Sequence, residues 1–345
     1  MKYSIIPNYV WDHLSDKMGK NHLPSVSAKI GSIKARSTRN QILKLPKSLK
    51  DKLFDSVASK NRIEVYDRDD ISLLNSDTIH PSENKIANQV YEQVLVVLRF
   101  LEEELGRDSY DGRGHTVRVV INADLNFGKR PEVQWDDNRM YFGIPNDMSI
   151  FNSFTSDIEV FGHELAHPMI IYEGKLCYES EDRNVKLSES GALHEHYADV
   201  FGIMVKHWFY EQIDPKLANW EIGSNMFQSG NPLRSMGNTA FIDDFGSGLH
   251  PVNIDDFRPE KGYHFNASIP NHAFYLATCE VGRPSWEIIG KIWYEALKSK
   301  HISECSSFEE VAKATLSVAK EMGEPFSDAQ QALEEAWKKV KVKIN

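Results

Sequence analysis

Two histidines four residues apart, with a glutamate beside the first, are the residues of this sequence best suited to metal chemistry. The run His163-Glu164-Leu-Ala-His167 has the form H-E-x-x-H. On a helix, both imidazoles project from one face and reach one metal ion. Glu164 then lies beside the ion and could take a proton from a bound water. We predict a zinc site on His163 and His167 with Glu164 as the base; the alternative is an ordinary helix that carries two histidines.

A third protein ligand must come from elsewhere, because catalytic zinc usually has three. Residues 191–202 are helix-compatible and largely apolar, yet they carry Glu195 and Asp199 on one face. Two carboxylates on a buried face are costly without a positive partner, which zinc and its histidines would supply. We predict that Glu195 is the third ligand and that Asp199 accepts the N–H of a ligand histidine. The alternative is an exposed acidic pair, against which the apolar flanks argue.

Together these segments resemble the thermolysin family of metallopeptidases, the gluzincins, which pair H-E-x-x-H with E-x-x-x-D on a second helix. Residues 232–236 are similar to the family's L-R-S-M segment, and residues 262–268 to its G-x-H-x-N segment. The resemblance covers roughly residues 60–345. It implies an α+β fold of two lobes, a mixed-sheet N-terminal lobe and a mainly helical C-terminal lobe, with the active site between them. The implied activity is that of a zinc-dependent endopeptidase acting on peptide or protein substrates.

The resemblance also implies roles for residues outside the zinc shell. Arg234 would bind a substrate carbonyl. His264 and Tyr178 would donate hydrogen bonds to the charge that develops during the reaction; for Tyr178 the alternative is a packed core ring. The acidic partner that orients the family histidine is not assigned, with Glu260 or an upstream aspartate as candidates.

One strand is expected to bind substrate. Residues 132–135 align with the family's N-A-x-W edge strand, which holds an extended peptide by strand addition. Trp135 is kept, whereas Glu132 and Val133 replace the asparagine and alanine. A carboxylate cannot donate the hydrogen bonds of an amide, so the contact at Glu132 must differ. The family preference implied for this chain is for bulky apolar residues just after the cleaved bond.

The family's double calcium site is predicted to be absent. The aligned positions are Glu159, Lys206, Asn219, Ser224 and Asn225, of which only the first keeps a carboxylate. Calcium needs several anionic oxygens, and the lysine would supply a positive charge instead. A calcium site elsewhere stays possible on the sequence.

Bulk properties exclude several other classes of protein. The chain has 345 residues, enough for two lobes, and a net charge of −10 without a basic tract, which argues against nucleic acid. No apolar run is long enough to span a membrane. Three cysteines do not suggest a disulfide framework. The N-terminus lacks the apolar core of a secretory signal, so we expect a cytoplasmic protein or one exported by a signal-independent route.

The expected organisation is a short pro-segment at 1–50, an N-terminal lobe at 51–172 that ends in the zinc helix, and a C-terminal lobe at 173–345. Pro7-Asn8-Tyr9 partly matches the Pro-Pro-Tyr-type motif of the protealysin-like branch, and basic residues follow it. We predict that this segment is removable and inhibits its own catalytic domain. The alternative is that the basic residues form a solvated face.

Apolar periodicity predicts a helix that ends at Gly106 and helices throughout 268–345. Alternating patterns predict strands at 61–67, 117–121 and 139–143.

Two irregularities accompany the zinc helix. Pro168 predicts that this helix either bends or stops early. The polar stretch 179–189 is predicted to be an inserted surface loop.

The competing hypothesis for the function is a binding or regulatory protein that kept the fold and lost the chemistry. The complete ligand set and Glu164 argue against it, while Pro168 and the altered edge strand favour it.

Overall fold

The computed structural model describes residues 63–67, 83–123, 133–136, 138–143, 150–173, 175–176, 185–237 and 249–344. The predicted pro-segment, Glu132 and Tyr178 lie outside the described residues. The strands are β1 (Ile63–Asp67), β2 (Val117–Ala123), β3 (Val133–Asp136), β4 (Arg139–Gly143), β5 (Glu221–Ile222) and β6 (Arg234–Ser235). The α-helices are α4 (Lys85–Leu105), α5 (Ile158–Tyr172), α6 (Val185–Phe209), α7 (Tyr263–Asn266), α8 (Ser268–Val281), α9 (Ile288–Lys298), α10 (Phe308–Met322) and α11 (Gln330–Lys339).

The predicted strands assemble into one four-stranded sheet in the order β1-β2-β4-β3. Strands β1, β2 and β4 run parallel, and β3 pairs antiparallel with β4 at the edge. Helix α4 packs on this sheet with an apolar stripe that includes Val90, Val94 and Leu101. The Asn84 side chain caps its N-terminus, and left-handed Gly106 ends it, as its sequence predicts. The mixed lobe expected from the sequence is therefore present.

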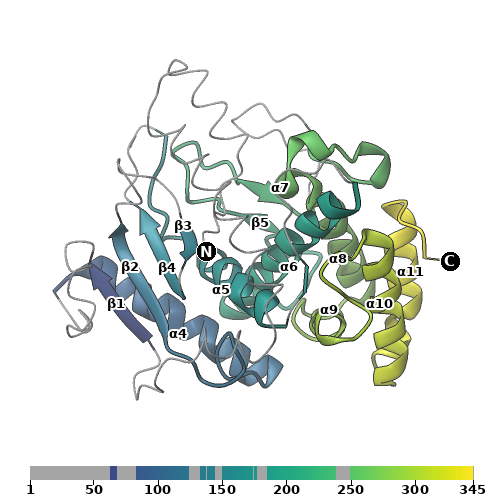
Figure 1. The fold of residues 1–345 in the computed structure, drawn as a ribbon, viewed down its shortest axis with the longest axis horizontal. Coiled ribbons are helices and arrows are strands. Elements are labelled where there is room, and N and C mark those ends of the chain that lie inside the picture. Colours follow the sequence, from purple (N-terminus) through teal and green to yellow (C-terminus); the bar gives the residue numbers. More distant parts are fainter. Residues whose placement is uncertain are drawn as a thin grey trace.

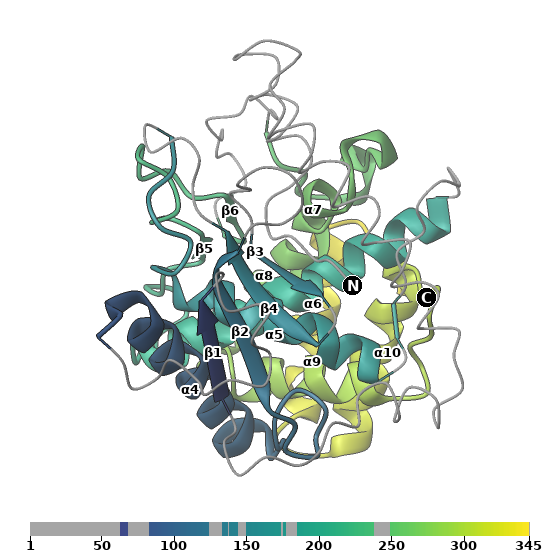
Figure 2. The ribbon, with the colours of Figure 1, turned by 60° about the vertical axis from the view of Figure 1, so that its left-hand side comes forward.

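Helices α5 and α6 form the centre of the molecule, between the sheet with α4 on one side and α8 to α11 on the other (Figure 1). In the turned view the sheet comes forward, and α5 and α6 extend behind it (Figure 2). Their close approach depends on two glycines. A Cβ on Gly202 would lie 2.5 Å from the carbonyl oxygen of Glu159, and one on Gly162 would lie 2.9 Å from the Cα of Gly202. This contact fixes the distance between the two predicted ligand helices.

We expect Gly202→Ala to destabilise the fold by about 1–3 kcal/mol, because overpacking forces the two backbones apart. Alanine favours a helix over glycine by about 1 kcal/mol, so intrinsic helix propensity would change stability in the opposite direction. Urea unfolding of the variant and the parent, each carrying a mutation that prevents self-cleavage, measures the difference. Equal or higher stability would show that the glycine contact does not set the helix spacing.

The structure excludes one of the two alternatives for the zinc helix at Pro168 and corrects an expectation about the stretch that follows this helix. Helix α5 does not stop after His167 but continues through Pro168 to Tyr172. Proline removes one backbone hydrogen bond, but Met169 to Ile171 are buried, and their packing holds the last turn. The predicted loop at 179–189 is wrong in its second part, because α6 begins at Val185. Its first part lies outside the described residues.

The C-terminal part is helical, as predicted, and α8 packs against α6, α9 and α11. Trp293 and Trp337 stack at 5.8 Å between ring centroids, with their planes 10° apart. One hydrophobic cluster runs from β1 to the residues after α11, so the two sides share a continuous core. Among the described residues, no helix combines the length and apolarity needed to cross a bilayer.

Candidate metal centre

Helix α5 presents three potential metal ligands in its buried interior. His163, Glu164 and His167 are fully buried, and each offers a ligand atom within 4.8 Å of the others. The two imidazole rings lie with centroids 4.8 Å apart. This cluster follows from the helical spacing of the H-E-x-x-H run.

Helix α6 brings a second carboxylate to this cluster. The Oε2 atom of Glu195 lies 3.4 Å from Nε2 of His163 and 3.2 Å from Nε2 of His264. Burial would raise the pKa of Glu195, but the charge of His264 and the hydrogen bond from His163 outweigh it and hold the pKa well below its usual value. The carboxylate is therefore ionised beside the imidazole.

Asp199, one turn further along α6, holds the other nitrogen of His163. Its Oδ1 lies 2.9 Å from Nδ1 of His163, and its two oxygens accept from Nη2 and Nε of Arg234 at 2.6 and 3.0 Å. Burial would raise the pKa of Asp199, but Arg234 and His163 lower it far below its usual range. An ionised carboxylate can only accept, so Nδ1 of His163 carries the proton and Nε2 faces Glu195.

The donor set fits zinc. Two atoms bonded to one tetrahedral zinc at about 2.0–2.2 Å lie roughly 3.3–3.6 Å apart. The 3.4 Å between Nε2 of His163 and Oε2 of Glu195 falls in that range. In the metal-free chain, burial would lower the pKa of His163, but hydrogen bonds to Asp199 and Glu195 raise it to about 9. The pocket is therefore built for a positive charge.

The other predicted site residues are placed as follows. Arg234 is 1% exposed and its guanidinium is held by Asp199, and His264 is buried beside Glu195. Val133 and Trp135 lie on the edge strand, but both side chains point into the core, where Trp135 meets Tyr110 edge-on at 5.1 Å. Only their backbone is thus available to a peptide. Glu260 is exposed, and no described contact joins it to His264.

The sequence reasoning missed a group of residues behind Asp199. His196 and Asn271 are buried, and Asn271 donates to Oδ2 of Asp199 at 2.9 Å. Burial lowers the pKa of His196 to about 4, so its ring is neutral. His194 also went unassigned; its ring lies 5.1 Å from that of His167, and its Nδ1 lies 2.7 Å from the carbonyl oxygen of Leu176. The His-Glu-His triplet at 194–196 was the available signal.

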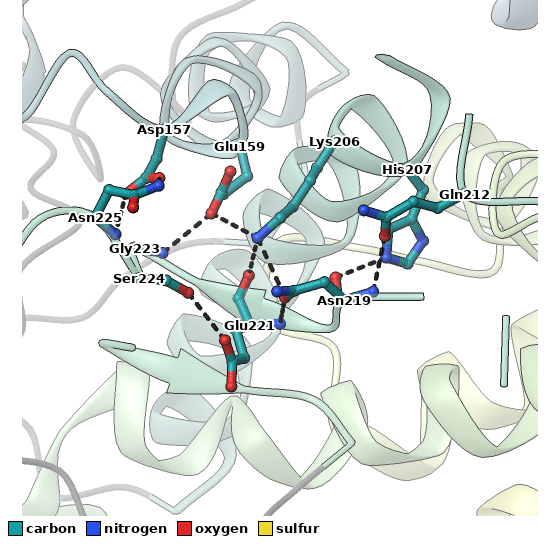
Figure 3. A network of polar contacts seen from close by, with 10 residues as sticks. All are labelled: Asp157, Glu159, Lys206, His207, Gln212, Asn219, Glu221, Gly223, Ser224 and Asn225. Atoms are coloured by element: carbon teal, nitrogen blue, oxygen red, sulfur yellow. Dashed lines mark hydrogen bonds and ion pairs between the residues drawn. The ribbon is translucent and has the colours of Figure 1, made fainter. Parts of the chain in front are cut away.

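A second polar cluster lies at the start of α5, around the ammonium of Lys206 (Figure 3). The Lys206 Nζ donates to Oε1 of Glu159 at 3.0 Å, to the carbonyl oxygen of Glu221 at 2.6 Å and to Oδ1 of Asn219 at 3.4 Å. Lys206 is 7% exposed and Glu159 is 1% exposed. The ammonium thus joins α5, α6 and the chain entering β5.

Asp157 borders the same cluster (Figure 3). It accepts from the backbone and side-chain nitrogens of Asn225 at 3.0 and 2.7 Å. Burial, and next the charge of Glu159, raise the pKa of Asp157 to about 6. Two buried acidic residues therefore lie near one buried ammonium.

Comparison with known proteins gives a consistent result. A model of the thermolysin metallopeptidase catalytic domain matches residues 46–170, and one of the thermolysin metallopeptidase alpha-helical domain matches residues 186–342. Protease PrtS of Photorhabdus sp. (strain Az29) is 32% identical, over 76% of this chain and 71% of that protein. An extracellular metalloprotease of Pectobacterium carotovorum subsp. carotovorum is also 32% identical, over 76% of this chain and 75% of its own length.

Among solved structures, the precursor of protealysin, a metalloproteinase from Serratia proteamaculans, superimposes with a TM-score of 0.76 at 26% identity. The match covers 99% of this chain and 100% of that chain.

Proposed function

The chain belongs to the thermolysin family of metallopeptidases, and from this premise we propose that it hydrolyses internal peptide bonds at a zinc ion held by His163, His167 and Glu195. The family membership makes it a metalloendopeptidase. The ligand assignment depends most on the position of Glu195. Its Oε2 lies 3.4 Å from Nε2 of His163, and Asp199 binds the other nitrogen of that ring, Nδ1.

Two carboxylates border the proposed metal, and helix geometry supports different roles for them. Neighbouring residues of a helix point about 100° apart, so Glu164 projects beside the two histidines rather than with them. Glu195 faces them from α6 and has the spacing of a ligand. We therefore assign Glu195 as ligand and Glu164 as general base.

In the proposed mechanism, several side chains of the protein have distinct roles. Bound zinc would act as a Lewis acid and lower the pKa of its water to about 7. Glu164 would take a proton from the attacking water and pass it to the leaving nitrogen. His264 stabilises the negative charge on the substrate oxygen, together with Tyr178 in the same proposal. Arg234 would bind a substrate carbonyl, because its guanidinium is held in place by two hydrogen bonds to Asp199.

We propose that the substrate binds as an extra strand on β3. This strand is at the sheet edge, and the inward direction of Val133 and Trp135 leaves the backbone as the contact. Glu132, outside the described residues, would add a carboxylate where the family has an amide. The proposed preference is for bulky apolar residues after the cleaved bond.

The pro-segment and domain boundaries also remain proposals. Residues 1–50 would be the intramolecular inhibitor, 51–172 the N-terminal lobe and 173–345 the helical lobe. Similarity to a solved metalloproteinase precursor over 99% of this chain supports a pro-segment.

We further propose that the cluster around Lys206 does not require calcium. The three oxygens that accept from Lys206 are of the kinds that hold calcium, a carboxylate, a backbone carbonyl and an amide oxygen. An ammonium with three donors already satisfies them.

The proposed function is tested by metal content and metal removal. Elemental analysis of the purified chain is expected to give one zinc per chain. A zinc chelator should remove it and stop casein cleavage, and added zinc should restore both, whereas a calcium-selective chelator should leave cleavage unchanged. A chain that binds no zinc and does not cleave casein would instead support the binding or regulatory protein. Cleavage that persists equally well after zinc removal would refute the zinc mechanism.

A further inference from the structure

A chain of four hydrogen bonds runs from the core of the helical lobe to His163. Trp293 Nε1 lies 2.7 Å from Nε2 of His196, whose Nδ1 lies 2.7 Å from Oδ1 of Asn271. Nδ2 of Asn271 then lies 2.9 Å from Oδ2 of Asp199, whose Oδ1 lies 2.9 Å from Nδ1 of His163. These five residues come from α5, α6, α8 and α9.

The indole donor of Trp293 sets the direction of the first three hydrogen bonds, and the ionised carboxylate of Asp199 sets the direction of the fourth. An indole nitrogen only donates, so Nε2 of His196 must accept and its Nδ1 must carry the proton. That proton goes to Oδ1 of Asn271, which turns the Nδ2 of the same amide toward Asp199. Oδ2 of Asp199 therefore accepts from Asn271 as well as from Arg234, and Oδ1 accepts from Arg234 and from Nδ1 of His163.

We propose that His196 and Asn271 are positioning residues for the metal centre. They hold Asp199 in the one orientation that keeps the proton on Nδ1 of His163 and presents Nε2 of that ring to the metal. The inference rests on the proposed function, because it assumes that the metal binds His163. Partners behind metal-bound histidines typically change metal affinity about 10–100-fold.

Helix α6 offers a matched control. His207 is also fully buried, its Nδ1 lies 2.9 Å from Oγ of Ser285 and its Nε2 lies 2.9 Å from the carbonyl oxygen of Asn219. Burial lowers its pKa to about 4, as for His196. Among the contacts of the described residues, none joins His207 to Asp199 or to a proposed ligand. His207→Leu thus reproduces the loss of a buried, hydrogen-bonded imidazole without touching the chain of bonds.

The test measures zinc affinity of full-length variants by competition with a chelating dye. Asn271→Leu is expected to weaken zinc binding about 10–100-fold and His196→Leu about tenfold, whereas His207→Leu should bind like the parent. His196→Asn keeps a donor at the position of Nδ1 and should restore most of the affinity. The visible absorption of the cobalt-substituted protein should shift in Asn271→Leu and not in His207→Leu.

The outcomes separate this inference from the proposed function. If the parent chain binds no zinc, the proposed function itself fails. If the parent binds zinc and the Asn271 and His196 variants match His207→Leu in affinity and cobalt spectrum, the positioning role is refuted. Should Asn271→Leu not fold, His196→Leu against His196→Asn still decides, because only the asparagine keeps the donor.

Discussion

Casein hydrolysis by Glu164→Gln is expected to fall by about 10²–10⁴-fold, the usual contribution of a positioned general base. Glutamine keeps the size of the side chain but cannot take the proton of water at neutral pH. Because Glu164 is proposed as base and not as ligand, the variant should still contain one zinc per chain. The measurements are kcat/KM on a fluorogenic peptide and zinc by elemental analysis.

The same charge change at a distant surface residue is the control. Glu280 lies in α8 and is exposed, so Glu280→Gln should leave kcat/KM and zinc content unchanged. Undiminished cleavage by Glu164→Gln would remove Glu164 from the mechanism. Loss of zinc together with activity would instead make Glu164 a ligand and reverse the roles assigned to the two carboxylates.

We expect Lys206→Met to lower the free energy of unfolding by about 3–5 kcal/mol, the usual cost of removing one partner of a buried ion pair. Glu159 would stay buried at 1% exposure without the ammonium that now lies 3.0 Å away. Asp157, whose pKa burial and Glu159 raise to about 6, would lose the same nearby cation. Denaturant unfolding in the Glu164→Gln background measures the loss without self-cleavage.

A surface lysine provides the comparison. Lys338 pairs with Glu334 at 3.1 Å, but its side chain is 59% exposed, so Lys338→Met should cost less than about 1 kcal/mol. If both lysine variants are equally stable, the Lys206 cluster does not hold the fold together.

A change of charge at Lys206 tests whether its ammonium takes the place of calcium in this cluster. Lys206→Asp would place a third acidic residue beside Asp157 and Glu159, together with the oxygens of Asn219 and Glu221. Because calcium prefers several anionic oxygens, calcium should raise the stability of this variant and leave the parent unchanged. A parent chain that calcium stabilises as strongly would contradict the proposed role of Lys206.

Much of the candidate site could be predicted from the sequence because its patterns are local. The four-residue spacing of His163 and His167 places both on one helix face wherever the helix packs. Glu195 and Asp199 share a face of α6 for the same reason. The end of α4 at Gly106 and the strands β1, β2 and β4 also follow from short-range signals. The sequence left open whether the helix bends or stops at Pro168, because the effect of a proline depends on how the following residues pack.

The sequence by itself therefore determined the family, the α+β class and the residue types available for zinc chemistry. Tertiary structure alone decided which atoms meet: Nδ1 of His163 is held by Asp199, Val133 and Trp135 turn inward, and Asn271 joins His196 across 75 positions. The physical reason is range. Helix and strand periods act over a few residues, whereas these contacts exist because glycines let α5 and α6 approach to backbone contact and one core joins both sides.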